Sequence, residues 1–521
     1  MADLLVHAKT VWTFDRAKPK AQAVGIRDGR ILCVGNVFEV RESLTRPLEL
    51  DLEDATVVPG LTDAHGHLVM LGRAAHEVEL AAARSAEEVA ALVAERAGQV
   101  PKGQWIRGQG WDQNRFPGGA FPDRTALDAA VPSHPVLLER VDGHAALVNA
   151  AALAVAGITK GSGGDPPGGQ ILRDELGEPT GVLVDTAMEL VLRHLPPPSA
   201  TELEQLLAEA ARRCAAAGLV GVHDAGVDLD VVEALRRLDE RGELPIRVYA
   251  MARAGGPRFA EILQAGPSSK GLVTVKAIKF FLDGALGSRG AALFQEYADA
   301  PGERGLITSP EPFAETLAEL MQLGFQPSLH AIGDRANALA LDALETAQQA
   351  SQRTDLRPRI EHVQVLRPGD LRRFAPLGAV ASVQPIHAIS DRPWAQARLG
   401  AERLLESGYL WKSLAEAGAR LAFGSDFPIE PPNPLRGLWA ACTRHGWPTT
   451  AECLERTAAI EAFTTGAAWA SFEEAETGRI VPGMRADLTA FDRDIVTEPP
   501  EALLETEVEL VMVGGKATFS D

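Results

Sequence analysis

Short apolar runs alternate with longer amphipathic stretches through most of the chain, and this alternation predicts parallel strand–helix units. The apolar runs predict eight strands, and eight is the number that closes a (β/α)8 barrel. In that α/β fold, catalytic side chains lie at the carboxyl ends of the strands. The predicted strands span residues 57–65, 219–224, 246–251, 273–282, 325–331, 359–363, 379–384 and 421–425.

The two ends of the chain show a different pattern. Residues 1–56 alternate apolar and polar positions over short stretches, with a hairpin turn at 27–30. Strand-like segments return in residues 478–521. We therefore expect a small β-sandwich domain built from 1–56 and 478–521, next to a TIM-like barrel domain at 57–477.

The connection between the first two predicted barrel strands, at about 68–218, is far too long for a plain loop. It contains apolar runs, a segment rich in glycine and proline, and a helical stretch at 201–217. We expect an α/β insertion that caps the active site, since a cap over a reactive centre excludes water and shapes the substrate pocket.

Two histidines follow the first predicted barrel strand, with one residue between them. In an extended backbone, residues two apart point the same way, so His65 and His67 can place two imidazoles on one metal ion. This spacing also arises by chance, mostly at surfaces. The rest of the chain favours a metal site, because four more predicted strands end in residues that bind metals in other proteins: Lys279, His330, His362 and Asp426.

The order of these motifs resembles the amidohydrolase superfamily. The segments are the HxH pair, KFFLDGALGSR at 279–289, HAIGD at 330–334, IEH at 360–362 and GSDFP at 424–428. Within the insertion, 108–115, 142–149 and 177–185 are similar to the branch of long metal-dependent hydrolases that includes N-substituted formamide deformylase. Each motif is weak by itself, but the ordered set is specific and spans nearly the whole chain.

The resemblance implies a TIM-like barrel, a β-sandwich from both termini, and one or two divalent metals, usually zinc. By position, it implies that His65, His67 and Asp426 hold the first metal and that His330 and His362 hold the second. It also implies that Lys279 is carboxylated by carbon dioxide and bridges the two ions.

The residue types suit hydrolysis of an amide-type C–N bond in a small molecule. Neutral imidazoles and carboxylates are ligands for zinc, and a metal-bound hydroxide can attack an amide carbonyl. Asp426 is the candidate proton shuttle, and it could also cap a helix, which does not exclude that role. The alternatives are a mononuclear deaminase of the same superfamily and an inactive structural or regulatory relative, which should have lost ligands.

Several further polar residues are candidates for the pocket wall. Substrate contacts are predicted for Trp111, His144 and Arg289, each of which could instead be structural. Asp334 could orient a ligand from behind. His223 and His387 lie near the ends of the second and seventh predicted strands, where lining and structural roles are both open. Structural roles are expected for the other histidines: His7, His76, His134, His194 and His445.

Composition narrows the possible partners. The 521 residues carry a net charge of −20 with a pI near 5.1, which argues against nucleic acid or an anionic membrane as partner. No apolar stretch reaches the length of a membrane span, and the four cysteines show no disulfide framework. We expect a cytoplasmic enzyme that binds a small-molecule amide and could form a homo-oligomer.

Overall fold

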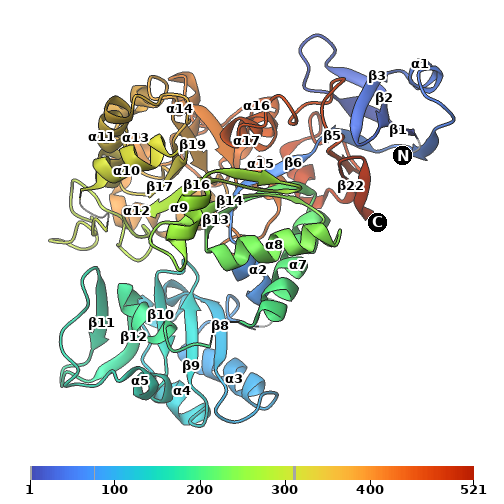
Figure 1. The fold of residues 1–521 in the computed structure, drawn as a ribbon. Coiled ribbons are helices and arrows are strands. Elements are labelled where there is room, and N and C mark those ends of the chain that lie inside the picture. The colour runs from blue at the N-terminus through green and yellow to red at the C-terminus, as the bar shows by residue number, and fades with distance from the viewer. Residues whose placement is uncertain (1–2, 75–76, 197, 309–311, 521) are drawn as a thin grey trace.

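A parallel barrel forms the centre of the molecule (Figure 1). The computed structural model describes residues 3–74, 77–196, 198–308 and 312–520. The barrel strands, each parallel to its neighbours in this order, are β6 (Leu61–Gly66), β13 (Leu219–Val227), β14 (Arg247–Arg253), β16 (Val273–Phe281), β17 (Gln326–Ala331), β18 (Arg359–His362), β19 (Val380–Val383) and β20 (Arg420–Phe423). The short strand β15 (Ser268–Lys270) adds to β16. All eight predicted strand regions contribute a barrel strand.

Backbone hydrogen bonds join the first and last barrel strands. The Asp426 amide donates to the His65 carbonyl at 2.7 Å, and the His67 amide donates to the Phe427 carbonyl at 2.9 Å. These bonds tie together the two chain segments that carry the HxH pair and Asp426. Closing the barrel therefore also brings these candidate ligands together.

Helices cover the outside of the barrel. Their apolar stripes pack on the strands, which are buried on both faces, as expected for parallel strands under helices. They are α2 (Leu68–Ala74), α7 (Ala200–Ala216), α8 (Leu229–Glu240), α9 (Phe259–Ala265), α10 (Phe313–Gln322), α11 (Asp334–Ser351), α12 (His387–Leu399), α13 (Ala401–Ser407), α14 (Trp411–Glu416), α15 (Pro434–Thr443), α16 (Arg456–Phe463) and α17 (Thr465–Ala470). Among the described residues, no helix has the length and apolar character needed to cross a membrane.

Both chain ends pair into one sheet, as predicted. Its strands run in the order β23 (Lys516–Ser520), β22 (Val508–Val513), β21 (Leu488–Phe491), β5 (Thr56–Pro59), β1 (Leu4–Trp12), β2 (Lys20–Arg27) and β3 (Arg30–Gly35), with β4 (Leu48–Asp51) also on β1. Helix α1 (Val37–Glu42) packs beside it. In Figure 1 this sheet lies at the upper right, where blue and red segments meet.

The predicted strand over 57–65 is in fact two strands. Its first part is β5, which pairs with β1 and β21 in the terminal sheet, and its second part is β6 in the barrel. Gly60 separates them at a close crossing, where a Cβ atom would lie 2.5 Å from the Val220 side chain. One apolar run thus serves two sheets, and a glycine makes the passage between them possible.

The long connection after β6 contains a separate sheet, which we call the cap. Its strands run in the order β11 (Gly169–Arg173), β12 (Pro179–Asp185), β10 (Ala145–Val148), β9 (Val136–Arg140), β8 (Ile106–Trp111) and β7 (Val78–Glu79). Its helices are α3 (Ala86–Ala97), α4 (Thr125–Ala130), α5 (Ala150–Ala156) and α6 (Glu189–Leu192). The cap lies below the barrel in Figure 1 and has its own apolar core.

The helical stretch predicted at 201–217 is α7, which lies outside the cap. Ser199 and Glu202 form a capping box at its start, in which each side chain accepts from the other residue's backbone amide. The helix packs against α2 beside the barrel. The cap is therefore held between two paired barrel helices.

Candidate metal centre

The six predicted ligands converge on one cavity at the mouth of the barrel. The cavity has a volume of about 340 Å³, and its wall includes His65, His67, Lys279, His330, His362 and Asp426. Five of the six side chains are buried, and His67 is half-buried. Residues separated by up to 361 positions meet here because each lies at or just beyond the carboxyl end of a barrel strand.

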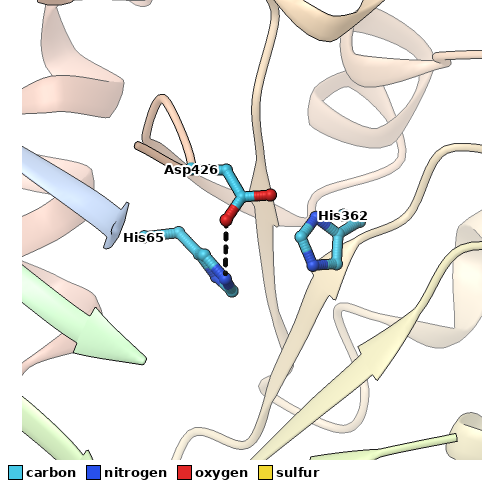
Figure 2. Close-up of side chains that lie close together, drawn as sticks. All are labelled: His65, His362 and Asp426. Carbon is cyan, nitrogen blue, oxygen red and sulfur yellow. Dashed lines mark ion pairs between the residues drawn. The ribbon is translucent and has the colours of Figure 1, made fainter. Parts of the chain in front are cut away.

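Asp426 lies at the centre of the group. Its Oδ1 is 3.0 Å from Nε2 of His67 and 3.5 Å from Nε2 of His65. The ligand atoms of Asp426, His65 and His362 all lie within 4.8 Å of one another (Figure 2). The ring centroids of His330 and His362 are 4.5 Å apart. These separations are short enough for shared metal ions.

Two of the candidate ligands have an unusual backbone. His362 has φ of 78° and Asp426 has φ of 62°, both in the left-handed region that side chains other than glycine rarely adopt. Such conformations cost on the order of 1–3 kcal/mol and concentrate at functional sites, where the surrounding structure enforces them. Here the hydrogen bond from the Asp426 amide to the His65 carbonyl contributes to that constraint.

Hydrogen bonds fix the tautomers of three histidines. Nδ1 of His65 donates to Oε2 of Glu361 at 2.7 Å, and Nδ1 of His67 donates to the Ala225 carbonyl at 2.9 Å. Nδ1 of His362 donates to Oε1 of Gln384 at 2.8 Å. Each partner oxygen only accepts, so Nδ1 of each ring carries a hydrogen and Nε2 is the atom directed into the site, where Nε2 of His67 lies 3.0 Å from Oδ1 of Asp426. This is the arrangement of metal-binding histidines.

The electrostatics keep His65, His330 and His362 neutral, which is the form that binds metals. At His67 burial opposes protonation, but hydrogen bonding to Asp426 outweighs it and raises the pKa. Burial, helped by the nearby Lys279, lowers the pKa of His65 to about 4. Burial also holds the pKa values of His330 and His362 well below their ordinary range. For Asp426, burial opposes ionisation, but hydrogen bonding to His67 and the surrounding histidines outweigh it and hold its pKa well below the usual value.

Two buried nitrogen atoms of the candidate ligands make no hydrogen bond within the described parts of the chain. Among the described residues, neither Nζ of Lys279 nor Nε2 of His330 has a hydrogen-bond partner. The Lys279 amine lies 5.0 Å from the Phe281 ring centroid, and burial lowers its pKa to about 8. Buried polar groups normally have partners. These two atoms, the Nε2 atoms directed into the site and the Asp426 carboxylate fit a centre that holds divalent metal.

A layer of buried polar residues lies beneath the histidines. Glu361 receives hydrogen bonds from His65, from Ser328 at 2.8 Å and from Arg359 at 2.8 Å. Burial opposes its ionisation, but Arg359 and His65 hold its pKa well below the usual value. Asp63 receives hydrogen bonds from the His65 amide and from the Ser425 amide and hydroxyl. Glu361 and Asp63 thus orient His65 on the first barrel strand, and Asp63 also holds Ser425, the residue before Asp426, after the last strand.

The orienting role predicted for Asp334 does not appear. Asp334 is the first residue of α11, and its carboxylate accepts from the Phe294 amide, whereas the carboxylate of Glu361 accepts from a ligand histidine. The signal for Glu361 is present in the sequence: Arg359 and Glu361 lie two residues apart in a short predicted strand, so their side chains point the same way and can pair. An acid in such a strand needs a buried partner.

Of the three predicted substrate contacts, the structure brings one to the cavity. His144, from the cap, lines it with Nδ1 at 2.9 Å from Oδ1 of Asp185. Trp111 is 0% exposed in the cap core, where Nε1 donates to the Leu138 carbonyl at 2.8 Å. Arg289 pairs with Asp299 at 3.1 Å and is not part of the cavity wall.

Other histidines divide between the cavity and the core. His387 lines the cavity, whereas His223 lies deeper, with Nδ1 2.7 Å from the Arg359 guanidinium. Of those expected to be structural, His7, His134, His194 and His445 are not part of the cavity wall, and His76 lies outside the described residues. Sequence reasoning did not single out Arg140, Asp391 or Trp394, which also line the cavity.

Comparisons with known proteins agree with this arrangement. The family model described as "Amidohydrolase family" matches residues 48–519. The chain belongs to the amidohydrolase family. It is 30% identical to N-substituted formamide deformylase of Arthrobacter pascens, over 99% of this chain and 98% of the relative. It is 35% identical to protein LONG AFTER FAR-RED 3 of Arabidopsis thaliana, over 100% of this chain and 92% of the relative.

A solved structure extends the likeness to the fold. An uncharacterized metal-dependent hydrolase from Pyrococcus horikoshii OT3 superposes with a TM-score of 0.79 at 28% identity, covering 96% of this chain and 99% of that one. The predicted family and fold are thus confirmed. The chain is a metal-dependent hydrolase of the amidohydrolase family.

Proposed function

We propose that the protein hydrolyses amide-type C–N bonds in small molecules rather than peptide bonds of proteins. The observation that carries this proposal is the presence of Lys279 in the same cavity as the four candidate ligand histidines and Asp426. A deaminase that uses a single metal would leave the buried Lys279 amine without a role. The similarity to a relative named for cleavage of N-substituted formamides supports the same bond class.

The donor set suits two divalent ions, and we propose zinc. His65, His67 and Asp426 would hold one ion, and His330 and His362 the other. Lys279 would join them as a carbamate: its neutral amine adds to carbon dioxide, forming an N–C bond and releasing one proton. The Lys279 amine is buried and has no hydrogen-bond partner among the described residues. Carboxylation explains such an amine beside metals better than a lysine that remains a cation, since a cation would be repelled by the metal ions.

The chain's own residues would carry the proton through the reaction. When bound, the metals supply a nucleophile at neutral pH and polarise the substrate carbonyl. Asp426 would take a proton from the attacking water and return it to the leaving nitrogen, so that an amide and water become a carboxylic acid and an amine. The cap would keep bulk water away from this exchange.

One feature favours the second candidate, a mononuclear deaminase. Within the described parts of the chain, one group of three residues, His65, His362 and Asp426, has all its ligand atoms within 4.8 Å of one another. Such a compact group suits a single ion. Counting the bound metals therefore separates the two candidate functions.

The test combines elemental analysis with a substrate panel. Purified protein should contain about two divalent ions per chain and should release amines from some of a set of N-formyl amines, N-acyl amines and cyclic amides. A mock purification from cells that lack the gene is the control for contaminating activity. One ion per chain, with ammonia released from aminopurines and no amide turnover, would favour the deaminase. A folded protein that takes up no metal would contradict both proposals.

A further inference from the structure

We propose that His387 is a further catalytic residue: a neutral imidazole whose Nε2–H donates a hydrogen bond to the substrate carbonyl oxygen as negative charge develops on it. This inference rests on the proposed amide hydrolysis. His387 is the first residue of α12, which follows barrel strand β19, and it is 7% exposed. It lies in the wall of the same cavity as the six ligands.

The hydrogen bonding of His387 is the reverse of that in three of the ligand histidines. The Gln364 side-chain amide donates from Nε2 to Nδ1 of His387 at 3.2 Å. Since Nδ1 accepts this bond, the ring hydrogen lies on Nε2. His65, His67 and His362 donate from Nδ1 and direct Nε2 into the site. His387 therefore presents a hydrogen to the cavity where they present ligand atoms.

A carboxylate fixes the orientation of the Gln364 amide. Oδ2 of Asp391 lies 3.4 Å from Nε2 of Gln364 and accepts from the Tyr409 hydroxyl at 2.6 Å. Burial raises the pKa of Asp391 to about 6, so the group is mainly ionised at neutral pH and can only accept. The amide must then direct its NH2 group toward both Asp391 and His387. Tyr409, Asp391 and Gln364 act as positioning residues for the His387 tautomer.

The donor is aimed at the reactive end of the cavity. Nε2 of His387 is 3.9 Å from Oδ2 of Asp426, too far for a hydrogen bond. It is buried and has no hydrogen-bond partner in the described parts of the chain. The His387 ring lies nearly parallel to that of His362, at 11° and 6.3 Å between centroids. An acceptor atom of the substrate, next to the proton shuttle, would complete the bonding of this N–H.

The chemistry favours a hydrogen bond over proton transfer. A neutral imidazole N–H is far too weak an acid to be given up near neutral pH, whereas a fixed donor stabilises charge as it appears on oxygen. Removing one such donor from other hydrolases lowers kcat about 100- to 1000-fold. Asp426 remains the group that returns the proton to the leaving nitrogen.

The activity test uses His387→Phe, which keeps a planar ring but has no donor, on the metal-loaded protein. The substrates are 4-nitroformanilide, formanilide and 4-methoxyformanilide, whose leaving anilines differ in basicity. We expect kcat to fall about 100- to 1000-fold by a similar factor for all three, with little change in KM or metal content. The exposed His445→Gln, outside the cavity, is the matched histidine control.

A second readout does not depend on turnover. Nitrogen-15 NMR of the metal-loaded protein, assigned with His387→Phe, should show His387 as the neutral Nε2–H tautomer. Asp391→Asn frees the Gln364 amide to turn, so it should change this tautomer signal and lower kcat while His445→Gln does neither. The Nδ1–H tautomer in the unmutated protein would overturn the inference.

The remaining outcomes separate this inference from the proposed function. If the unmutated protein is active and His387→Phe stays within about threefold of it, the donor role of His387 is wrong while amide hydrolysis stands. A loss of rate that grows with the basicity of the leaving aniline would make His387 a proton donor to nitrogen and also overturn the inference. No turnover of any amide in the wider panel would overturn the proposed function itself.

Discussion

The barrel rim and the cap both contribute to one cavity, but they do so in different ways. At the rim, residues from separate strands meet because the carboxyl ends of barrel strands converge, whatever their distance in sequence. In the cap, the packing of the cap's own core decides which side chains face inward. Trp111 is therefore buried in that core, while His144 reaches the cavity. A residue type at a strand end is thus a better guide to the site than a residue type in an insertion.

The two regions also hold their polar side chains differently. Rim histidines such as His65 are fixed from behind by acceptors such as Glu361, and their Nε2 atoms are directed at the site. Cap side chains at the cavity pair mainly with one another, as Arg140 does with Asp112 and Asp142. We therefore expect substitutions at the rim to remove metal or chemistry and substitutions in the cap to change substrate preference or stability.

The largest effect should come from Asp426→Asn at the rim. The amide keeps the shape of the side chain but cannot take up the proton of the attacking water, so kcat should fall about 100- to 10,000-fold. KM should change far less, since substrate binding does not need the carboxylate. Steady-state kinetics on the best amide of the panel measures both values. Near-normal turnover would show that Asp426 is not the proton shuttle.

Lys279→Ala should have the next largest effect. Loss of the proposed bridge should remove at least part of the metal and most of the activity, and added acetate or propionate should restore some turnover by entering the space left by the side chain. Metal content and rescue kinetics give the result, and carbon NMR with labelled bicarbonate should show the carbamate in the unmutated protein. Full turnover with both metals retained in Lys279→Ala would exclude the bridge.

Much of the rim was predictable because it depends on local sequence. Each ligand lies near the carboxyl end of a predicted strand, and the barrel geometry supplies the convergence. The layer of buried polar residues beneath the ligands was not predictable. The contact between Glu361 and His65 joins β18 to β6 across 296 positions, and it depends on which way each side chain points. Likewise, the apolar run at 57–65 does not indicate that the chain leaves the terminal sheet at Gly60 and enters the barrel.

The cap was predictable only as a folded insertion. The length of the connection required structure, and a sheet with helices is present. Which cap side chains face the cavity depends on the turns between its strands, and that information is absent from residue type. Trp111 and His144 looked equally suited to bind a substrate, although the Trp111 indole donates to a backbone carbonyl inside the cap.

Glu361→Gln tests the layer beneath the rim and should have a moderate effect. The change removes the negative charge of Glu361. Since that charge pairs with Arg359 and makes His65 a stronger ligand, metal affinity should fall about 10- to 100-fold. Competition with a chelator measures it. Glu430→Gln makes the same chemical change in the cavity wall at a residue that is not among the proposed ligands, and should leave metal affinity unaltered. Equal effects from the two variants would contradict the orienting role of Glu361.

In the cap, His144→Ala should have a smaller effect confined to the substrate. His144 faces the cavity near His330, with ring centroids 6.1 Å apart, but its Nδ1 is held by Asp185. We expect KM for some amides to rise up to about tenfold and the order of preference within the panel to change, with metal content unaltered. Loss of metal in His144→Ala would instead make it part of the metal centre.

Trp111→Phe should have the smallest effect on catalysis and should reveal itself in stability. The substitution removes the hydrogen bond from Nε1 to the Leu138 carbonyl. It also replaces the indole, which packs against Phe121 with ring centroids 6.2 Å apart, by a smaller phenyl ring. A lost hydrogen bond to a buried carbonyl and a small cavity together cost roughly 1–3 kcal/mol. The thermal unfolding midpoint should therefore fall, while kcat and KM stay unchanged across the panel because Trp111 does not reach the cavity. A changed KM with unaltered stability would instead place the indole at the substrate. The cap core would then take part in substrate binding rather than only support the cavity wall.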